Sequence, residues 1–534
     1  MSMFCYQCQE TLNNAGCTVK GVCGKNENVA NLQDLMIDEL KEIALSLEES
    51  SIEKINENGP FIMKALFLTI TNVNFDENAV FDYIKRAINI KNKLNMKNAD
   101  NFQDNNPSIS DLLSVAAKKS ILNEKDLDKR SLKELLIYGL KGVAAYTDHA
   151  YILGFENNEI YKFAIEALAA TKKDLSINEY INLVNRCGSM AVSAMELLDR
   201  ANTSTYGNPV ITKVKTNVGS RPGILVSGHD LKDLYELLEQ SKDQGIDIYT
   251  HSEMLPAHYY PKLKEFDHLY GNYGSSWWNQ GKEFDSFNGP ILMTTNCITN
   301  VKETYKSRFF TTGAAGWPET KHIKDRTNGG SKDFSEIIAM AKKCNPPTKL
   351  EDGFIVGGFA HNQLMSLSDS ILNAVNTGKI KKFIVMAGCD GRHKSREYYS
   401  EVAMKLPKNT VILTAGCAKY RYNKLNLGEI DGIPRVIDAG QCNDSYSLAY
   451  IALKLKEILG LDDINKLPIA YDIAWYEQKA VCVLLGLLSL GVKGIRLGPT
   501  LPGFLTENVA KTLINVYDLK GIKTADEDIK EMLV

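Results

Sequence analysis

The chain has 534 residues and a formal net charge of −3, from 62 basic and 65 acidic side chains. Because this length is too great for a single hydrophobic core, we expect two to four domains. An apolar content of 44% and a charged content of 24% are ordinary for a globular protein in water. The balanced charge gives no support for a polyanion-binding surface, so we predict no nucleic-acid partner.

The sequence predicts neither a secretory signal nor a membrane span. Residues 1–8 lack the basic segment and the apolar segment that a signal peptide requires. The longest apolar stretch, Ala480–Val492, has 13 residues, whereas a bilayer needs roughly 20. We therefore predict no membrane association and, by elimination, a cytoplasmic location.

The eleven cysteines indicate metal or redox chemistry, because cytosolic thiols stay reduced and rarely form disulfides. Four of them, Cys5, Cys8, Cys17 and Cys23, form the pattern C-x2-C-x8-C-x5-C with glycines around them. Four thiolates can hold zinc or a 4Fe–4S cluster, and the spacing alone leaves both open. A thioredoxin-like redox pair is disfavoured, because no βαβ pattern surrounds the first two cysteines.

Residues 27–206 are predicted to form a helical bundle. Apolar residues recur there at helical spacing in four stretches, which are most simply the core faces of helices. The polar, Asn-rich residues 96–110 are predicted to form a loop, and Cys187 to be a small buried hydrophobe. The four helical stretches are 31–47, 132–145, 160–170 and 177–198.

Near Asn208 the apolar pattern changes from helical repeats to short runs that alternate with helical segments. Such an alternation predicts strands of a doubly wound parallel sheet. A further run at 354–361 predicts the start of a second sheet. We therefore expect a multidomain α plus α/β fold, in which a helical-bundle domain precedes two doubly wound, Rossmann-like α/β domains. The first predicted strands are 223–226, 247–250 and 290–295, and the expected domains are 1–207, 208–355 and 356–534.

A cysteine recurs at the ends of the predicted strands. Two short apolar runs are followed directly by Ala-Gly-Cys and end at Cys389 and Cys417, and looser versions end at Cys442 and Cys297. In open α/β sheets, sites lie beyond the carboxyl ends of the strands. We therefore expect these four thiols to be aimed at one buried inorganic centre.

Other polar residues follow predicted strands in the same way. Each of them alone is most simply a hydrogen-bonded loop residue, and Lys479 could simply pair with Glu477. Together, imidazole, carboxylate and thiolate are unusual for one structural zinc and suit a multi-iron centre. Of the remaining cysteines, Cys344 is interpreted as incidental and Cys482 as part of the core. The predicted strand-end set is His229, Glu253, Cys297, Cys389, Cys417, Cys442 and Glu477, with Lys479 close by.

Six longer motifs carry a resemblance that runs from end to end of the chain. The sequence closely resembles the hybrid-cluster proteins, also called prismane proteins or hydroxylamine reductases. The motifs are long and specific, so a chance match is not a serious competitor. They are Phe4–Thr11, Ser227–Leu231, Ser252–His258, Gly388–Arg392, Thr414–Lys419 and Trp475–Ala480.

The resemblance implies two iron–sulfur centres. The four N-terminal cysteines match the family branch whose motif holds a 4Fe–4S cluster, where another branch has wider spacing and a 2Fe–2S cluster. The seven strand-end residues fall on the family positions that hold a hybrid 4Fe–2O–2S cluster. Cys389 matches a cysteine that can carry a persulfide, and Lys479 matches a position beside the hybrid cluster.

The activity that the resemblance implies is reduction of hydroxylamine to ammonia and water, with electrons from an external donor protein. We expect Lys479 and a displaced Glu253 to supply protons, and Cys389 to act through its persulfide. Two alternatives stay open: reduction of nitric oxide to nitrous oxide, and a nitrosative-stress sensor or protein S-nitrosylating factor acting through Cys389. A carbon monoxide dehydrogenase-like activity is disfavoured, because that related fold uses a nickel site and the ligand set here matches the hybrid-cluster pattern.

Overall fold

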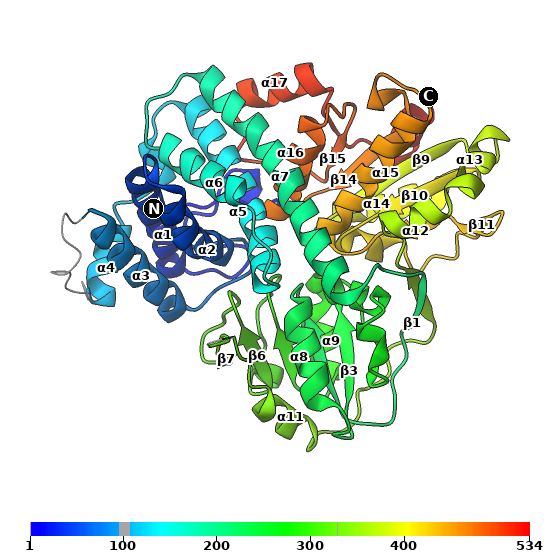
Figure 1. The fold of residues 1–534 in the computed structure, drawn as a ribbon, viewed down its shortest axis with the longest axis horizontal. Coiled ribbons are helices and arrows are strands. Elements are labelled where there is room, and N and C mark those ends of the chain that lie inside the picture. The colour runs from blue at the N-terminus through cyan, green and yellow to red at the C-terminus, as the bar shows by residue number, and fades with distance from the viewer. Residues whose placement is uncertain (1, 96–106, 328) are drawn as a thin grey trace.

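The computed structural model of the protein describes residues 2–95, 107–327 and 329–534. A group of helices from the N-terminal part of the chain lies beside two α/β units, each built on a six-stranded sheet (Figure 1). The predicted fold class, helices followed by two doubly wound α/β units, is therefore confirmed. The exact domain boundaries stay predictions.

Four helices of the first part, α1, α5, α6 and α7, contain the four predicted apolar stretches, whereas α2, α3 and α4 lie outside them. Polar caps explain where several begin: the side chains of Asn26 and Asp126 accept backbone hydrogen bonds at the starts of α1 and α5. Of the predicted loop, residues 96–106 lie outside the described residues, and α4 already begins at Ile109. The helices are α1 Glu27–Leu47, α2 Ile52–Leu68, α3 Glu77–Asn95, α4 Ile109–Ala116, α5 Leu127–Ile152, α6 Asn158–Ala170 and α7 Ile177–Tyr206.

The first six-stranded sheet has the order β4-β3-β2-β5-β6-β7, and all its neighbouring strands are parallel. Its central strands are buried along their whole length, as expected for a sheet covered on both faces. The strands are β2 Gly223–Ser227, β3 Asp247–His251, β4 Leu269–Asn272, β5 Ile291–Met293, β6 Phe309–Thr312 and β7 Lys321–Ile323; the helices are α8 Leu231–Ser241, α9 Gln280–Ser286, α10 Glu303–Lys306 and α11 Ser335–Ala341.

The second sheet has the order β13-β10-β9-β14-β15-β16 and is also parallel throughout. Its strands are β9 Lys382–Gly388, β10 Thr410–Thr414, β13 Val436–Asp438, β14 Ile469–Ala474, β15 Arg496–Gly498 and β16 Lys520–Gly521. A short hairpin is formed by β11 Glu429–Ile430 and β12 Ile433–Pro434. The helices are α12 His361–Ser366, α13 Ser368–Asn376, α14 Glu397–Lys405, α15 Ser445–Ile458, α16 Gln478–Ser489, α17 Glu507–Tyr517 and α18 Ala525–Met532.

The strand predicted to begin the second sheet, at residue 354, lies outside that sheet. The strand predicted from residue 354 exists as β8 (Phe354–Gly357), but it pairs antiparallel with β1 (Thr212–Lys215) and not with the second sheet. Its burial alternates, as expected for a two-stranded ribbon with one solvated face. The second sheet therefore begins at β9, and β8 links the two α/β units as part of a separate ribbon.

Helix α16 belongs by sequence to the last α/β unit but packs into the helical bundle against α5 and α7. Glycines permit this close packing. A Cβ at Gly142 of α5 would lie 2.3 Å from the Cβ of Cys482, and a Cβ at Gly188 of α7 would lie 2.2 Å from the carbonyl oxygen of Leu485. The start of α16 is thereby held at a fixed position between bundle and sheet.

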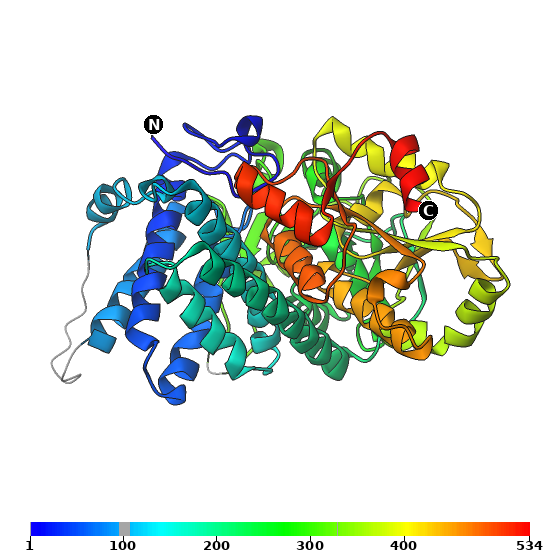
Figure 2. The ribbon, with the colours of Figure 1, turned by 90° about the horizontal axis from the view of Figure 1, so that it is seen from above.

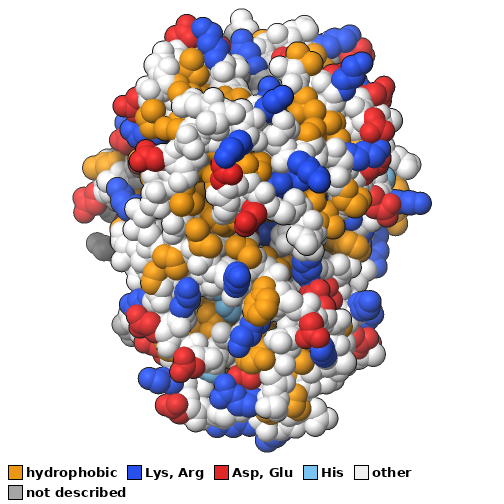
Figure 3. Space-filling view, turned by 90° about the vertical axis from the view of Figure 1, so that its right-hand side faces the viewer, with side chains coloured by type: hydrophobic (Ala, Val, Ile, Leu, Met, Phe, Trp, Pro, Cys, Tyr) orange, Lys and Arg blue, Asp and Glu red, His pale blue; other side chains and the backbone are white. Residues whose placement is uncertain are grey.

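The N-terminal segment before α1 lies over the junction between the bundle and the C-terminal unit, beside α17 (Figure 2). The amide of Asn14 donates to the carbonyl of Leu501 at 3.1 Å, which ties the two ends of the chain together. On the face shown in Figure 3, acidic and basic side chains are interspersed, in keeping with the small net charge. None of the helices in the described ranges has the length and apolar character needed to cross a bilayer.

We predict that Gly188→Ala destabilises the protein by roughly 1–3 kcal/mol, because the added methyl group collides with the backbone of α16. The matched control is Gly486→Ala, in the same helix–helix contact. There the nearest atom to a new Cβ is 3.4 Å away, so the better helix propensity of alanine should leave stability unchanged or raise it. Thermal unfolding monitored by circular dichroism measures both. Equal melting temperatures for the two variants would contradict this account of the packing.

Candidate metal centres

The four N-terminal cysteines lie on one compact loop. Cys5 and Cys17 face each other as a two-residue antiparallel bridge, with N–O distances of 3.0 and 2.8 Å. The hydroxyl of Thr11 donates to the Cys5 carbonyl at 2.9 Å. Gly16 has a φ of +142° and lies under the ring of Phe4, where a Cβ would be 2.5 Å from the nearest ring carbon. The loop thus brings cysteines 12 residues apart to the same place.

Two thiols of this loop, those of Cys5 and Cys8, lie in an environment that disfavours the free thiolate. Burial, the largest effect, raises the pKa of Cys5 to about 11, although the nearby ammonium of Lys25 lowers it. Burial also raises the pKa of Cys8 well above its usual value, and the neighbouring Cys23 and Cys5 raise it further. All four thiols are unpaired. Convergent, buried thiols that repel one another as thiolates are suited to a cation that neutralises them.

Three predicted donors follow three adjacent strands of the first sheet. His229 comes after β2, Glu253 after β3 and Cys297 after β5. Because all three strands are parallel, their carboxyl ends lie at one edge of the sheet. The Nε2 atom of His229 lies 3.7 Å from Oε2 of Glu253.

The other four predicted donors follow four adjacent strands of the second sheet. Cys442, Cys417, Cys389 and Glu477 come after β13, β10, β9 and β14, in the spatial order of those strands. Parallel pairing again delivers them to a single edge. Each sheet therefore presents its donors at its carboxyl edge, as the sequence pattern predicted.

The two carboxyl edges face each other, and direct contacts join them. The backbone N–H of Cys442 donates to Oε2 of Glu253 at 2.9 Å. The hydroxyl of Ser252 lies 3.2 Å from Sγ of Cys417. The amide of Asn296 donates to Oε1 of Glu477 at 3.2 Å. Every one of these contacts connects a residue of the first sheet to a residue of the second.

Within this site the donors form two groups. Ligand atoms of His229, Glu253 and Cys442 all lie within 4.8 Å of one another, close enough to share a metal ion. Cys297, Cys389 and Cys417 pack together in a cluster that also contains the aromatic rings of Trp277, Trp278 and Tyr476. The structure thus places three thiols on an apolar, aromatic side, and one thiol, a carboxylate and an imidazole on a polar side.

Lys479 lies at the polar side and is almost completely buried. Its ammonium donates to Nε2 of His229 at 2.9 Å and to Oδ1 of Asn296 at 2.7 Å, and lies 3.6 Å from Oε1 of Glu477. Burial lowers its pKa, but the anionic forms of Cys442, Glu477 and Cys297 outweigh that effect and raise the pKa overall. Since Nε2 of His229 accepts a hydrogen bond, the proton of the neutral ring is on Nδ1, 2.8 Å from the Thr295 hydroxyl.

Burial shifts six of the seven donors toward their neutral forms. It raises the pKa of Cys389 to about 12 and raises the pKa values of Cys297 and Cys417 well above normal. It also raises the pKa of Glu253 and lowers that of His229. Oε1 of Glu253 is buried and has no hydrogen-bond partner among the described residues. A buried carboxylate oxygen without a partner costs free energy, so it fits a metal-binding role.

Several residues around this site were absent from the sequence prediction. Asn296 touches Cys297, Glu477 and Lys479. The amide of Gln441 donates to the carbonyls of His229 and Glu253, at 3.1 and 2.8 Å. Both residues directly precede a predicted cysteine in the sequence, and this adjacency could have indicated that they lie at the site. Of the other cysteines, Cys187 and Cys482 are fully buried in helices, which confirms that they are core residues.

The two candidate centres are joined by the segment that precedes α16. The backbone N–H of Gln9, next to Cys8, donates to the Tyr476 carbonyl at 2.9 Å. The side-chain amide of Gln478 donates to the carbonyl of Gln7 at 2.6 Å. Tyr476 itself packs in the aromatic side of the second site. A short, ordered route through residues 475–479 therefore runs between the two groups of cysteines.

The donor set, four thiols in one loop and four thiols with an imidazole and two carboxylates in the other site, fits iron–sulfur chemistry. The sequence matches the family model described as Prismane/CO dehydrogenase family over residues 3–530. It is 58% identical to proteins named hydroxylamine reductase from Chlorobaculum tepidum, covering 99% of each chain, and from Nitratidesulfovibrio vulgaris, covering 99% of this chain and all of the relative.

Among solved structures, carbon monoxide dehydrogenase IV from Carboxydothermus hydrogenoformans superposes with a TM-score of 0.59. The match covers 99% of this chain and 92% of that chain, at 14% sequence identity. At this level of identity the likeness concerns the fold alone.

We predict that the double variant Cys8→Ser, Cys17→Ser loses about half of roughly eight irons per chain, since it removes thiolates of the first centre only. Iron analysis and electron paramagnetic resonance of anaerobically purified protein measure this. The control is Cys344→Ser, whose thiol lies in a loop and donates only to the carbonyl of Met340. Full iron content in the double variant, or zinc in place of iron at the first centre, would contradict the assignment.

Proposed function

Because the chain belongs to the Prismane/CO dehydrogenase family, we propose that it is a hydroxylamine reductase. Its relatives of 56–58% identity carry that name over essentially their whole length. The observation that best supports the proposal is the convergence of seven metal-binding side chains and one lysine at the facing edges of two parallel sheets. The reaction consumes two electrons and two protons for each N–O bond broken, and yields ammonia and water.

The residues that would hold the two centres follow from their chemistry. Cys5, Cys8, Cys17 and Cys23 would hold a 4Fe–4S cluster. At the second site, the thiols of the aromatic side would hold the sulfide-rich part of a hybrid 4Fe–2O–2S cluster, and the imidazole and carboxylates its harder, oxygen-bearing part. Bound iron supplies a Lewis acid and a store of electrons for cleavage of the N–O bond. The seven residues are His229, Glu253, Cys297, Cys389, Cys417, Cys442 and Glu477.

Lys479 is proposed to donate a proton to the leaving group from its Nζ atom. In the structure, Nζ of Lys479 donates a hydrogen bond to the lone pair of Nε2 of His229. A metal bound through Nε2 needs the same lone pair, so metal binding would release the ammonium from His229. It would still be held by Asn296 and Glu477, next to the site and protonated. Glu253 is the second proposed donor, through its unpartnered Oε1.

Cys389 is proposed to carry an extra sulfur as a persulfide. Its thiol lies on the aromatic side of the site, and its backbone carbonyl accepts a hydrogen bond from Arg396 at 3.2 Å. Because burial keeps the thiol protonated, a more acidic sulfur at this position would bind a metal with less competition from protons.

We propose that an external electron-donor protein delivers electrons at the four-cysteine loop. This loop exposes the apolar side chains of Leu12, Val19 and Val22, of which Val19 is 73% exposed. The hydrogen-bonded segment around Tyr476 leads from it to the second site. We also propose a cytoplasmic location, which the eleven unpaired cysteines favour because a reducing compartment preserves them.

A second candidate reaction, reduction of nitric oxide to nitrous oxide, is favoured by one observation. An apolar cavity of about 40 Å3 lies between β9, α15 and α16 and reaches Cys389 and Cys442. Its wall is formed by residues such as Leu448, Ala452 and Leu487. Such a route suits a small apolar diatomic better than hydroxylamine, which must give up hydrogen bonds to water on entering it.

We predict that Lys479→Met lowers turnover of hydroxylamine by about 10²–10⁴-fold, the usual contribution of a general acid, and leaves iron content and the paramagnetic spectrum intact. Methionine replaces the buried ammonium with a side chain of similar length. Lys493→Met, an exposed position just after α16, is the control. Normal turnover in Lys479→Met would remove this residue from the mechanism.

A variant that fills the apolar cavity can distinguish the two candidate substrates. We predict that Ala452→Leu, which fills the cavity, lowers kcat/KM for nitric oxide by roughly tenfold and changes that for hydroxylamine much less. Steady-state assays at low concentrations of each substrate measure the ratio. Ala339→Leu, at an exposed position of α11, controls for the added volume. An equal loss for both substrates would mean that they share one route.

A further inference from the structure

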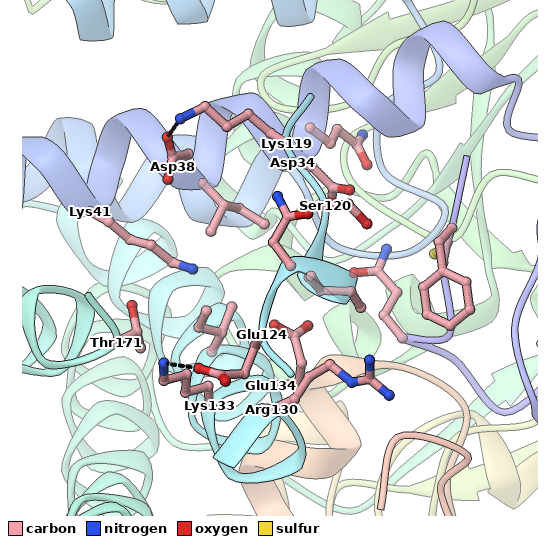
Figure 4. A pocket seen from close by; sticks show the side chains of 18 of the residues that line it. Asp34, Asp38, Lys41, Lys119, Ser120, Glu124, Arg130, Lys133, Glu134 and Thr171 are labelled. Carbon is pink, nitrogen blue, oxygen red and sulfur yellow. Dashed lines mark hydrogen bonds and ion pairs between the residues drawn. The ribbon is translucent and has the colours of Figure 1, made fainter. Parts of the chain in front are cut away.

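A second, quite different cavity lies behind the four-cysteine loop. It has a volume of about 400 Å3 and is enclosed by α1, α5 and the segment that connects α4 to α5 (Figure 4). Phe4, Cys5 and Gln7 of the loop form part of its wall. The volume is within the range of small-molecule binding sites, roughly 300–1,000 Å3. The reaction proposed above makes no use of this cavity.

The wall of the cavity carries a local excess of positive charge. Seven of its side chains are cationic and four are acidic, whereas the whole chain has a net charge of −3. A concave surface with one excess charge concentrates small ions of the opposite sign. The cations are Lys25, Lys41, Lys119, Arg130, Lys133, Lys141 and Lys172, and the acids are Asp34, Asp38, Glu124 and Glu134.

Ion pairs within the wall neutralise only part of this excess. Asp38 pairs with Lys119 at 2.7 Å and with Lys172 at 2.6 Å, and Glu124 pairs with Lys133 at 2.6 Å. Figure 4 shows two of these pairs, Asp38 with Lys119 and Glu124 with Lys133. They use two of the four acids and leave four cations to be accounted for.

Two of these four cations are buried and donate only to neutral oxygens. Lys25 is 3% exposed and donates to the side-chain carbonyl of Gln33. Lys141 is 2% exposed and donates to Oε1 of Gln7 at 2.8 Å and to the carbonyl of Thr69 at 3.2 Å. Neither ammonium has a direct acidic partner among the residues that the structure describes. Burial lowers the pKa of Lys141 to about 8, and the nearby Glu134, Cys5 and Asp34 offset part of that effect.

The other two, Lys41 and Arg130, have no acidic group within 4.0 Å among the described residues. Figure 4 shows the Lys41 ammonium directed into the cavity from α1, and Arg130 extending along it from α5. Burial lowers the pKa of Lys41, an effect that nearby acids only partly offset. An anion placed between the two would supply the missing charge.

The two acids without an ion pair do not cancel this excess. Burial raises the pKa of Asp34 to about 7, so near neutral pH this carboxyl is protonated in only part of the molecules. Glu134 lies beside Tyr138 on α5. Even with both carboxyls ionised, these two acids face four basic side chains, although burial lowers the pKa of Lys41 and lowers that of Lys141 to about 8.

From this arrangement we propose that the cavity is a binding site for a small anion that carries a phosphate or pyrophosphate group. Lysine ammonium groups and an arginine fork are the usual partners of phosphoryl oxygens. A ligand with two or more negative charges could pair with both Lys41 and Arg130, the two cations that face the cavity without an acidic partner in the described part of the chain. In its protonated form, Asp34 can donate to one further phosphoryl oxygen.

Calorimetric titration of the intact, iron-loaded protein tests the proposal, with sodium pyrophosphate and inorganic phosphate as probes and sodium chloride of equal ionic strength as the blank. We expect saturable binding of one pyrophosphate per chain, and weaker binding of phosphate if the natural ligand is a larger ester. Tighter binding of phosphate would identify the free ion as the ligand. Absence of saturable binding for both probes would overturn the proposal.

Variants locate the site. Lys41→Gln combined with Arg130→Gln should weaken pyrophosphate binding at least tenfold, whereas Lys511→Gln combined with Lys530→Gln, an equal loss of charge at exposed positions of α17 and α18, should not. Unchanged affinity in the double variant would overturn the assignment. If that variant fails to fold, the wild-type protein provides the test: pyrophosphate should slow reductive methylation of Lys41 and not of Lys530, as measured by mass spectrometry. Equal rates with and without pyrophosphate would count against the site.

Discussion

The structure depends on one electrostatic constraint, the placement between the carboxyl edges of two parallel sheets of a buried lysine and seven side chains of metal-ligating types, five of them buried. Without compensation, each buried polar or charged group costs free energy. The protein offsets part of that cost with cross-sheet contacts such as Cys442 to Glu253 and Asn296 to Glu477. The remainder, seen in the raised thiol pKa values and in the unpartnered oxygen of Glu253, is the interaction that a bound iron–sulfur centre would satisfy. Stability of the two α/β units and loading of the centre are therefore expected to be coupled.

Helix α16 connects this site to the helical bundle and to the four-cysteine loop. Its first residues supply the cap Glu477 and the buried Lys479, and Gln478 holds the four-cysteine loop through the Gln7 carbonyl. Its remainder is packed on the glycine-lined faces of α5 and α7. The bundle, the N-terminal loop and the second sheet thus meet on one helix. A shift of that helix would change the distance between the two candidate centres as well as the geometry of the second.

The two cavities described above differ in polarity and therefore suit different ligands. The cavity at Cys389 and Cys442 is apolar and small, and suits a neutral substrate of a few atoms. The cavity at Cys5 is large and cationic, and suits an anion. Because they lie at different centres and are lined by different elements, an anion in the second need not compete with a substrate in the first. The proposed phosphate-class ligand would then act independently of substrate access.

The sequence by itself determined the local features of this protein. Helical spacing predicted the bundle, the four-cysteine spacing predicted a first centre, and the apolar runs before Cys389, Cys417 and Cys442 predicted strands that end at functional groups. These are short-range patterns that depend on backbone geometry and burial over a few residues. Only the tertiary structure decided which strands are neighbours, that the two carboxyl edges face each other, and that β8 pairs with β1. The facing edges, the pairing of β8 with β1 and the cationic cavity between α1 and α5 arise from packing of segments far apart in the sequence, and no local pattern encodes them.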